Sequence, residues 1–433
     1  MSDYHSTKGV QKGIRIHGVE DIRLDDIPLP KIEDADDAIV KVLLAGLCGS
    51  DLHVFRGRES NFSAPFVMGH ELYGEIVALG DSFQAGDGTQ RRPKGYSQYK
   101  VGMKVFATFS VSCLECEACS LGQTSRCAKS LLFGSPALSG TQAQFVRIPK
   151  AGGTLIEAPV DETTGREIAP SIGILLADIL PTGYFAAKQA LEHPNLVPLL
   201  HPQFASMGVG FVDSVYATEV STSSIDSTAV FSFAVIGLGP VGVCALVALI
   251  DRLLLCLEHT PMAFSILAID LLESRRVDAM NSIGRLKDER IRVGTSPSKG
   301  TPGVYIDSVA PSNVAPSNTC IGVLEVVGHP SSLTLAAEIS KPFGVISSVG
   351  VHSFPNFPIS PPTLYNKNLS FAFGRCPVRA LLPAARSLLS RRYAAFETFV
   401  EKTVGFTAGN DVKAAYERYN RGEGGKICFD PWK

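Results

Sequence analysis

The sequence has no excess of charge of either sign. Its 433 residues contain 40 Lys and Arg against 42 Asp and Glu, which gives a formal net charge of −2. Without a strongly basic or acidic balance, there is no electrostatic reason to expect a nucleic acid or a membrane surface as a partner. A hydrophobic content of 45% with 19% charged residues is that of a globular protein.

A long apolar run is also lacking. The longest one, GVCALVALIDRLLLCLEH, is interrupted by Asp251 and Arg252, whereas a helix that spans a bilayer needs about 20 apolar residues. The first residues, MSDYHSTKGVQKGIRIHG, contain no apolar core of the kind found in secretory signals. We therefore expect a soluble cytoplasmic protein whose ten cysteines are mostly reduced. Its length suffices for two domains.

Two different textures divide the chain. From about residue 12 to 170, short apolar runs are punctuated by Gly, Pro and Asp, which predicts an irregular β-rich domain. From GYFAAKQAL onward, helix-length apolar segments alternate with strand-like runs such as FSFAVIG, which predicts βαβ units on a parallel sheet. The domain boundaries that we expect are 1–182, 183–375 and 376–433, and the last part should hold amphipathic helices and a short strand, GKICF.

Three segments do not fit these textures. Residues 82–100 are polar and contain glycines and basic residues, so we expect a surface loop there. Residues 192–228 and 294–319 show no clear helix or strand pattern, and we expect insertions or loops in both.

Four cysteines stand close together in SCLECEACSLGQTSRC, within the segment 109–130. The spacing C-x2-C-x2-C-x7-C places four thiolates on one lobe, which suits tetrahedral Zn(II) and leaves no coordination position open. A closed site of this kind is structural. Reduced core cysteines and an iron–sulfur cluster are the alternatives. The residues are Cys113, Cys116, Cys119 and Cys127.

A second candidate metal site joins two turns about 20 residues apart. LCGSDLH supplies Cys48 and GHELYG supplies His70, a thiolate and an imidazole that are both good zinc ligands. Glu71, next to His70, can tune such a site or bind the metal transiently. On chemistry alone, Cys48 and His70 are equally well explained as unrelated structural residues.

The segment VFSFAVIGLGPVGVCALVAL is typical of a dinucleotide site, since a strand, a Gly-x-Gly-x-x-Gly turn and a helix follow one another. Such glycines let the backbone approach a pyrophosphate, which the N–H groups at the start of the helix bind. The strand-like run FSILAID then ends in Asp270, placed to bind ribose hydroxyls and to repel a 2′-phosphate, so NAD is favoured over NADP. Asp270 lies 28 residues after Gly242, which predicts an extended helix or an inserted turn between them. The turn itself consists of Gly237, Gly239, Pro240, Val241 and Gly242.

Taken together, these motifs resemble those of the zinc-dependent medium-chain alcohol dehydrogenases, over roughly residues 12–190 and 229–430. The resemblance implies a GroES-like β-rich catalytic domain, a Rossmann domain, NAD and two Zn(II) per chain. It implies a structural zinc on the four clustered cysteines and a catalytic zinc on Cys48, His70 and Asp178. Asp178 stands four residues before Thr182 in ADILPTGY, where many members have cysteine, and this departure is similar to the glutathione-independent formaldehyde dehydrogenases. Three protein ligands leave one position open for chemistry.

The resemblance also implies roles for single residues. Ser50 and His53 would carry the proton of the alcohol towards solvent, while Asp51 would support the metal ligands. Phe109 would line the substrate pocket. Arg275 would touch the ribose, although with the neighbouring Arg276 it could also tolerate a phosphate. Further cofactor contacts would come from Val327, Val349, Val351 and Lys426, for which core valines and a plain surface lysine are the alternatives.

The resemblance thus implies a zinc-dependent oxidoreductase that transfers hydride between an alcohol or carbonyl compound and NAD(H), as a homo-dimer or homo-tetramer. Two alternatives stay open at this point. One is a tailoring enzyme of the same fold that acts on a large metabolite, with or without redox chemistry. The other is a non-catalytic protein that binds zinc and a nucleotide.

Overall fold

The chain forms two units in the computed structural model: Met1–Pro181 together with Cys376–Lys433 (unit 1), and Thr182–Arg375 (unit 2). The structure describes residues 4, 9–58, 65–83, 92–160, 165, 167–200, 230–258, 263–295, 303–308, 319–406 and 409–433. Within these ranges no single helix is long and apolar enough to cross a membrane, although the bent pair Pro170–Ala177 and Ile179–Leu191 matches a span in length and composition.

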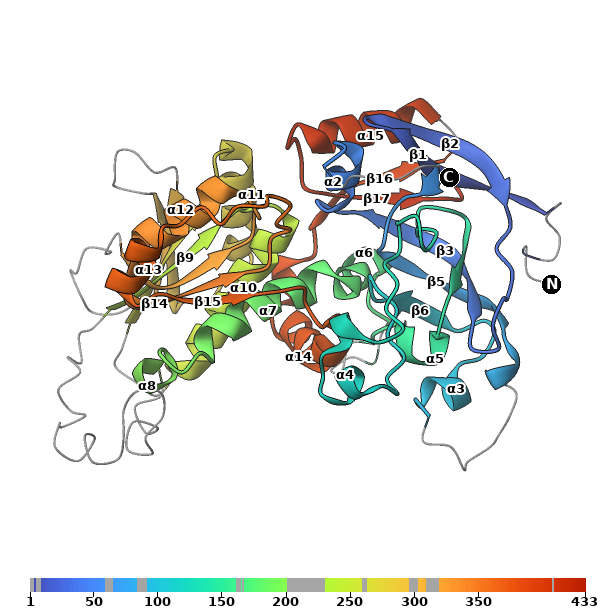
Figure 1. The fold of residues 1–433 in the computed structure, drawn as a ribbon. Helices are drawn as coiled ribbons and strands as arrows, with labels where there is room; N and C mark the ends of the chain where they lie inside the picture. Colours follow the sequence, from blue (N-terminus) through green and yellow to red (C-terminus); the bar gives the residue numbers. More distant parts are fainter. Residues whose placement is uncertain are drawn as a thin grey trace. The chain divides into compact units, whose positions relative to one another are not determined.

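Unit 1 is built around two sheets that are antiparallel except where β16 pairs in parallel with β17 (Figure 1). A three-stranded sheet has the order β2-β1-β4, and a larger one has the order β16-β17-β3-β5-β6-β8, with β7 paired to β3. The strands are β1 (Val10–Gly18), β2 (Asp21–Pro28), β3 (Ala38–Leu47), β4 (Phe66–Val67), β5 (Leu72–Leu79), β6 (Lys104–Ala107), β7 (Phe145–Ile148), β8 (Leu155–Glu157), β16 (Val400–Gly405) and β17 (Lys426–Asp430).

The helices of unit 1 are short, apart from two near the C-terminus. They are α2 (Asp51–Phe55), η1 (Asp81–Phe83), α3 (Gly95–Gln98), α4 (Glu117–Ser120), η2 (Thr124–Arg126), α5 (Ala151–Thr154), α6 (Pro170–Gly173), η3 (Ile174–Ala177), α14 (Val378–Arg391), η6 (Tyr393–Ala395) and α15 (Gly409–Asn420). The amphipathic helices and the final strand expected in the tail are thereby confirmed.

The C-terminal segment completes the core of unit 1. Strand β17 pairs with β3 in register Ile427 to Leu47 and Phe429 to Ala45, next to the carboxyl end of β3. The hydroxyl of the buried Tyr416 donates to the side-chain oxygen of Gln142, 2.6 Å away. Because these contacts join residues far apart in the sequence, the end of the chain fixes the position of the turn that follows β3.

Unit 2 is a seven-stranded sheet in the order β11-β12-β10-β9-β13-β14-β15. From β10 to β15 neighbouring strands are parallel, as predicted, whereas β12 is antiparallel to both β10 and β11. The strands are β9 (Val230–Ile236), β10 (Ala263–Ile269), β11 (Ile291–Thr295), β12 (Gly303–Ser308), β13 (Cys320–Glu325), β14 (Ser340–Ser348) and β15 (Ser370–Phe373). The helices are α7 (Ile179–Leu191), which begins in unit 1, α8 (Val197–Leu200), α10 (Pro240–Cys256), α11 (Glu273–Gly284), α12 (Pro330–Ile339) and α13 (Pro361–Lys367).

All three segments expected as loops contain regular structure among their described residues. The expectation for 294–319 is wrong in part, because β12 lies within it and buries Tyr305 and Ile306. In the segment 82–100, the described residues include α3, where Tyr96 is buried, and Tyr99, whose hydroxyl donates to the Leu155 carbonyl oxygen. Aromatic burial therefore outweighs the polar composition there. Most of the segment 192–228 lies outside the described residues.

The glycine turn of unit 2 follows β9 directly. Gly237 has φ +92°, a value that glycine adopts without strain. A Cβ atom at Gly242 would overlap the carbonyl oxygen of Gly237, so only glycine lets the first turn of α10 approach the end of β9 this closely. Helix α10 then runs for 17 residues, which confirms the extended helix expected before Asp270.

We expect the substitution Gly242→Ala to destabilise unit 2, because the added methyl group must push α10 away from β9. Overpacking of this kind costs about 1–3 kcal/mol, which urea unfolding would show as a lower midpoint. Gly239→Ala is the matched control. Its Cβ would lie 4.0 Å from the nearest side-chain atom, Cζ of Arg275, and its φ is −64°. Equal stability of the two variants would contradict the close packing at Gly242.

Candidate active site

Four potential metal ligands meet in unit 1. Cys48 follows β3, His70 and Glu71 precede β5, and Asp178 lies between η3 and α7. One ligand atom from each of the four lies within 4.8 Å of those of the other three. As whole residues, all four are at most 9% exposed. Three separate segments of the chain thus converge on one small buried volume.

The spacing of these atoms suits a single zinc ion. The Sγ of Cys48 lies 3.7 Å from Oδ2 of Asp178, and Nε2 of His70 lies 3.3 Å from the same oxygen. Tetrahedral zinc with bonds of about 2.3 Å to sulfur and about 2.0–2.1 Å to nitrogen or oxygen separates its ligands by about 3.6 Å and about 3.3 Å respectively. The residues present therefore fit a zinc ion held by Cys48, His70 and Asp178.

The electrostatics of the cluster also favour a cation. Burial lowers the pKa of His70, but the Asp51 charge and the hydrogen bonds to Asp178 and Asp51 outweigh it and raise this pKa well above its ordinary value. Asp51 lies with Oδ1 3.3 Å from Nδ1 of His70, and its Oδ2 accepts a hydrogen bond from the Cys48 N–H at 2.9 Å. Asp51 thereby orients two ligands, the supporting role expected for it.

Glu71 forms a fully buried ion pair with Lys426. The ammonium lies 2.7 Å from Oε1 and 2.5 Å from Oε2 of Glu71, and it also donates to the Leu47 carbonyl oxygen at 3.0 Å. Burial lowers the pKa of Lys426, but the Glu71 charge outweighs this and holds it above its ordinary value. A side chain at Gly46 would overlap the Glu71 carboxylate. In this structure the ammonium of Lys426 pairs with the Glu71 carboxylate. The cofactor contact expected for Lys426 therefore stays a prediction.

Ser50 directly precedes the short helix α2, and His53 lies within it. The Oγ of Ser50 is 3.4 Å from Nε2 of His70, so this hydroxyl borders the cluster. His53 is partly buried, and among the described residues its Nδ1 has no hydrogen-bond partner. Burial, followed by the charges of Arg58 and Arg56, lowers the pKa of His53 to about 4. The imidazole is therefore neutral at pH 7, and it is a weaker base than an ordinary histidine.

Phe109 also borders the cluster. Its ring meets that of His70 edge to face, with 6.4 Å between the ring centres, and the side chain is 6% exposed. An aromatic wall against a metal ligand fits the pocket role expected for Phe109.

The four clustered cysteines converge as a second group, again with their sulfur atoms within 4.8 Å of one another. The Cys116 and Cys127 sulfurs are 3.9 Å apart, and those of Cys127 and Cys113 are 3.4 Å apart. Four sulfurs around one zinc are separated by about 3.8 Å. These separations suit one zinc ion better than an iron–sulfur cluster, whose bridging sulfides need more space.

Backbone amides favour the thiolate form of Cys116, whereas burial raises the pKa values of Cys113 and Cys119. The N–H groups of Glu115 and Ala128 donate to the sulfurs of Cys113 and Cys116, at 3.4 and 3.5 Å. Hydrogen bonds from the backbone of Ala128 and Cys119 lower the pKa of Cys116 to about 6. A thiolate at neutral pH is the form that binds metal.

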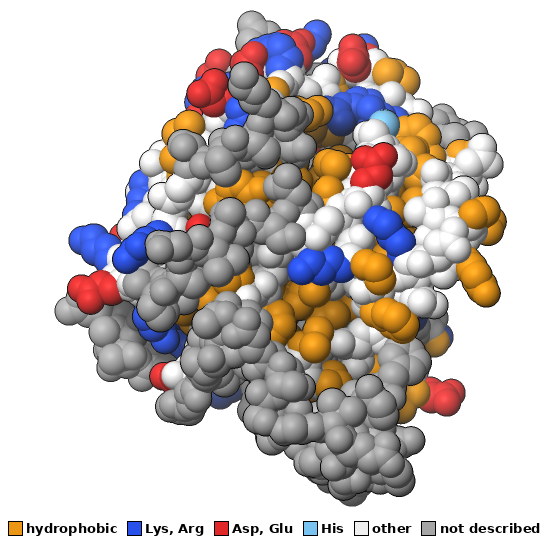
Figure 2. Space-filling view, turned by 90° about the vertical axis from the view of Figure 1, so that its left-hand side faces the viewer, with side chains coloured by type: hydrophobic (Ala, Val, Ile, Leu, Met, Phe, Trp, Pro, Cys, Tyr) orange, Lys and Arg blue, Asp and Glu red, His pale blue; other side chains and the backbone are white. Residues whose placement is uncertain are grey.

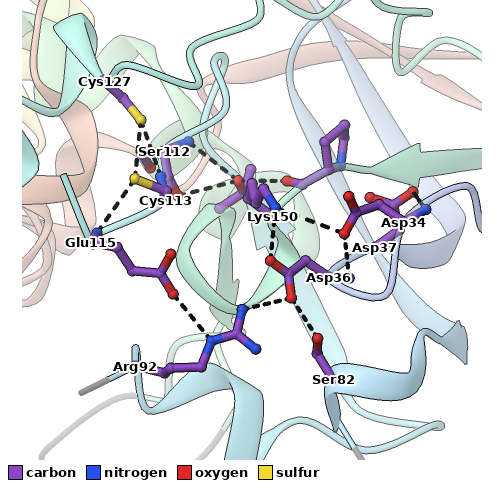
Figure 3. Close-up of polar contacts among 12 residues, drawn as sticks. Asp34, Asp36, Asp37, Ser82, Arg92, Ser112, Cys113, Glu115, Cys127 and Lys150 are labelled. Atoms are coloured by element: carbon purple, nitrogen blue, oxygen red, sulfur yellow. Dashed lines mark hydrogen bonds and ion pairs between the residues drawn. The ribbon is translucent and has the colours of Figure 1, made fainter. Parts of the chain in front are cut away.

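Ion pairs fasten this lobe to the rest of unit 1 (Figure 3). Glu115 accepts a hydrogen bond from Nε of Arg92 at 3.2 Å, and Nη2 of Arg92 reaches Oδ1 of Asp36 at 2.6 Å. Lys150 and Ser82 also donate to Asp36. Burial raises the pKa of Asp36, but the hydrogen bonds from Lys150, Ser82 and Arg92 outweigh it and hold this pKa well below its usual range.

The predicted cofactor residues of unit 2 gather at the carboxyl end of the parallel strands. Asp270 follows β10, and its Oδ2 accepts a hydrogen bond from the Leu238 N–H of the glycine turn at 2.8 Å. Arg275 lies 3.6 Å from the same oxygen, whereas Arg276 donates to the Asp270 carbonyl oxygen at 2.5 Å. Asp270 therefore stabilises the conformation of the glycine turn through its hydrogen bond to the Leu238 N–H.

Three predicted valines lie on the two loops that follow β13 and β14. Val327 is 44% exposed and Val351 is 42% exposed, while Val349 is partly buried. Core packing therefore does not explain Val327 and Val351. Sequence reasoning gave no role to Glu325, a fully buried acid between these loops. The sequence feature that could have indicated a role for Glu325 is its position as a single charged residue at the end of the apolar run CIGVL.

Comparisons with known proteins agree with this architecture. Residues 34–159 match the family described as the alcohol dehydrogenase GroES-like domain. The chain is 32% identical to zinc-type alcohol dehydrogenase B from Aspergillus flavus over 428 residues, which cover 98% of this chain and 82% of that protein. It is 36% identical to the medium chain reductase/dehydrogenase ucsI from an Acremonium species over 341 residues, which cover 79% and 94% of the two chains. The solved alcohol dehydrogenase TADH from Thermus sp. ATN1 has a TM-score of 0.66 at 25% identity, covering 97% and 99%.

Substitutions should separate the two clusters of ligands. We expect Cys48→Ala or Asp178→Ala to remove one zinc ion per chain while the fold and its stability stay close to wild type. Cys116→Ala should remove the other ion and cost several kcal/mol, because binding at a structural site contributes directly to folding. Metal analysis and urea unfolding measure both effects. Cys256→Ala, a change at a half-buried cysteine outside both clusters, is the control. Equal destabilisation by all three cluster variants would refute the distinction.

Proposed function

The chain belongs to the zinc-type alcohol dehydrogenases of the medium-chain dehydrogenase/reductase family, and we propose that Cys48, His70 and Asp178 hold its catalytic zinc. It is an oxidoreductase that transfers hydride between an alcohol or carbonyl compound and a nicotinamide cofactor. The observation that carries the proposal is the set of ligand separations in unit 1, which suits one ion. The names of the relatives favour this activity over a non-redox tailoring reaction.

The residues in and around the cluster of Cys48, His70, Glu71 and Asp178 have different roles at the proposed metal. Bound there, zinc would act as a Lewis acid towards the oxygen of the substrate. Cys48, His70 and Asp178 hold it, and Asp51 keeps the imidazole and the turn of Cys48 in place. The ion pair between Glu71 and Lys426 neutralises a further buried charge beside the cluster. We propose a second, structural zinc on the four cysteines, and thus two ions per chain.

Ser50 and His53 move the proton in this proposal. The Ser50 hydroxyl borders the cluster and is placed to accept a hydrogen bond from an alcohol. The neutral His53 has a free acceptor or donor position at Nδ1, within the described part of the chain. A neutral imidazole of this kind can relay the proton released by the alcohol to solvent, and its low pKa means that it holds this proton only transiently.

Unit 2 holds the cofactor in this proposal. NAD would supply the hydride acceptor. Gly237 and Gly242 let the backbone approach the pyrophosphate, and the N–H groups at the start of α10 bind it. Asp270, at the end of β10, receives the ribose hydroxyls and repels a 2′-phosphate, which supports NAD over NADP.

The division of labour between the units follows from these assignments. We propose that unit 1 is the GroES-like catalytic domain and that unit 2 is the Rossmann cofactor domain. The carboxylate of Asp178, in place of a thiolate, supports a place in the subgroup similar to glutathione-independent formaldehyde dehydrogenases. Replacing sulfur by oxygen makes the ligand set harder.

A homo-dimer or homo-tetramer is the assembly that we propose. Among the described residues β15 pairs only with β14, so its other edge is open to pairing. Phe371 and Phe373 of this strand stack on each other, and Phe357, 50% exposed, packs edge to face against both. Figure 2 shows that hydrophobic side chains also reach the surface on the face that it displays.

Following NADH absorbance with a panel of alcohols tests the proposed function. We expect carbonyl product and NADH in equal amounts, with loss of turnover in Asp178→Ala. His53→Ala should retain folding but lower kcat on the order of tenfold at pH 7. Most of this loss should disappear by about pH 9, because hydroxide then takes the proton directly. Wild-type protein that carries zinc and NAD yet turns over no alcohol or aldehyde would indicate a non-catalytic protein. Product without NADH would indicate tailoring chemistry.

The cofactor preference has its own test at Asp270. We expect Asp270→Ser to lower the ratio of kcat/KM for NAD to that for NADP by about tenfold, or about 1.4 kcal/mol. Asp270→Asn keeps the acceptor for the Leu238 N–H and removes only the charge, so it separates repulsion from turn geometry. An unchanged ratio in both variants would remove Asp270 from the ribose site.

A further inference from the structure

Glu325, the last residue of β13, is 0% exposed, and its carboxylate accepts four hydrogen bonds. Oε1 accepts from the N–H groups of Val327 and Gly328 at 2.9 and 2.8 Å and from Oγ of Ser332 at 2.7 Å. Oε2 accepts from Oγ of Ser348 at 2.6 Å. A buried carboxylate is costly unless its oxygens are satisfied in this way.

The four donors come from three different parts of unit 2. Two are on the loop 326–329, one is in the first turn of α12, and Ser348 is the last residue of β14, directly opposite Glu325 in the sheet. A Cβ atom at Gly328 would overlap the Val351 carbonyl oxygen, and one at Gly350 would overlap the Gly328 nitrogen. The loops after β13 and β14 therefore touch through their backbones, with one carboxylate beneath them.

A second step of hydrogen bonding extends this link to His352. The Oγ of Ser348 lies 2.7 Å from Nε2 of His352 as well as 2.6 Å from Glu325. Ser348 has a single hydroxyl proton, and with Glu325 ionised that proton must go to the carboxylate. His352 is then the donor, with its proton on Nε2. Hydrogen bonds through Ser348 thus link Glu325 to His352, so that both ends of the loop 349–352 are tied to the same hydroxyl.

We propose that Glu325 is a positioning residue for the nicotinamide cofactor. It holds the loops 326–329 and 349–352 in the arrangement in which their main-chain groups bind the carboxamide. This inference rests on the proposed function, and it adds a residue that acts only through others, since Glu325 has no exposed surface.

The exposure of the loop side chains supports this assignment. Val327 and Val351 are 44% and 42% exposed, so burial of apolar surface anchors the two loops only weakly. The hydrogen bonds to Glu325 are then the main constraint on their conformation. Ordering a binding loop in advance removes an entropic cost from each binding event. Loss of the constraint should therefore weaken cofactor binding more than it weakens the fold.

Two neighbouring serines provide a matched pair of variants. Ser348 donates to Glu325, whereas Ser347 points to the other face of the sheet and donates to Oε1 of Gln189 at 3.2 Å. Both are at most 1% exposed. Ser348→Ala should raise the Kd for NADH and the KM for NAD about tenfold, with kcat close to wild type. It should also lower the unfolding midpoint modestly, because Oε2 of Glu325 loses its hydrogen bond. Ser347→Ala should leave the Kd unchanged. Fluorescence titration with NADH and steady-state kinetics measure these values.

Variants at Glu325 itself provide the graded test. Glu325→Gln keeps one oxygen for the N–H donors of Val327 and Gly328, so its Kd should lie between wild type and Glu325→Ala. If Glu325→Ala fails to fold, the serine pair still decides. Equal Kd values for Ser348→Ala, Ser347→Ala and a wild type that binds NADH would overturn the positioning role. A wild type that binds no nicotinamide cofactor would instead overturn the proposed function, and this inference with it.

Discussion

The burial of several negative groups around one small volume is the constraint on which unit 1 depends. A thiol, an imidazole and the carboxylates of Asp178 and Glu71 meet where water is largely excluded, and such a group of charges is unstable without compensation. Lys426 compensates Glu71, and the proposed zinc ion would compensate the rest. The turn after β3, the turn before β5 and the start of α7 supply these groups, and strand pairing and hydrogen bonds within unit 1 hold them in place. The fold therefore brings together residues that are suited to bind a cation.

Unit 2 uses a buried carboxylate in a different way. Glu325 accepts hydrogen bonds from N–H and O–H donors of neighbouring loops, and the imidazole of His352 lies 3.6 Å from its Oε2. Asp270 follows the same principle at the glycine turn, where it accepts from Leu238. In both places an acid at the end of a parallel strand organises the backbone that follows. At the carboxyl end of the parallel strands, carboxylate oxygens at the strand ends thus accept hydrogen bonds from N–H groups of the loops.

Much of this could be read from the sequence, for reasons that are physical. Ligand spacings, the glycine turn and the change of periodicity near residue 180 are local patterns, and the structure brings both groups of metal ligands together. The partners of Lys426 and Glu325 are set by strand pairing between distant segments, which no local pattern encodes. Strand β12 was missed because its flanking residues are rich in Ser, Pro and Gly. Tyr96 was missed because a polar neighbourhood concealed one buried ring.

The pairing of β17 with β3 has a consequence for how the molecule is made. During synthesis, the strand that closes the main sheet of unit 1 emerges only after the whole of unit 2. Unit 2 can acquire its structure as one continuous piece, while the first half of unit 1 must wait with an open sheet edge beside Leu47. Such an edge invites pairing with other chains. Assistance during this interval, by a chaperone or by rapid completion of the chain, would decide how much protein reaches its native state.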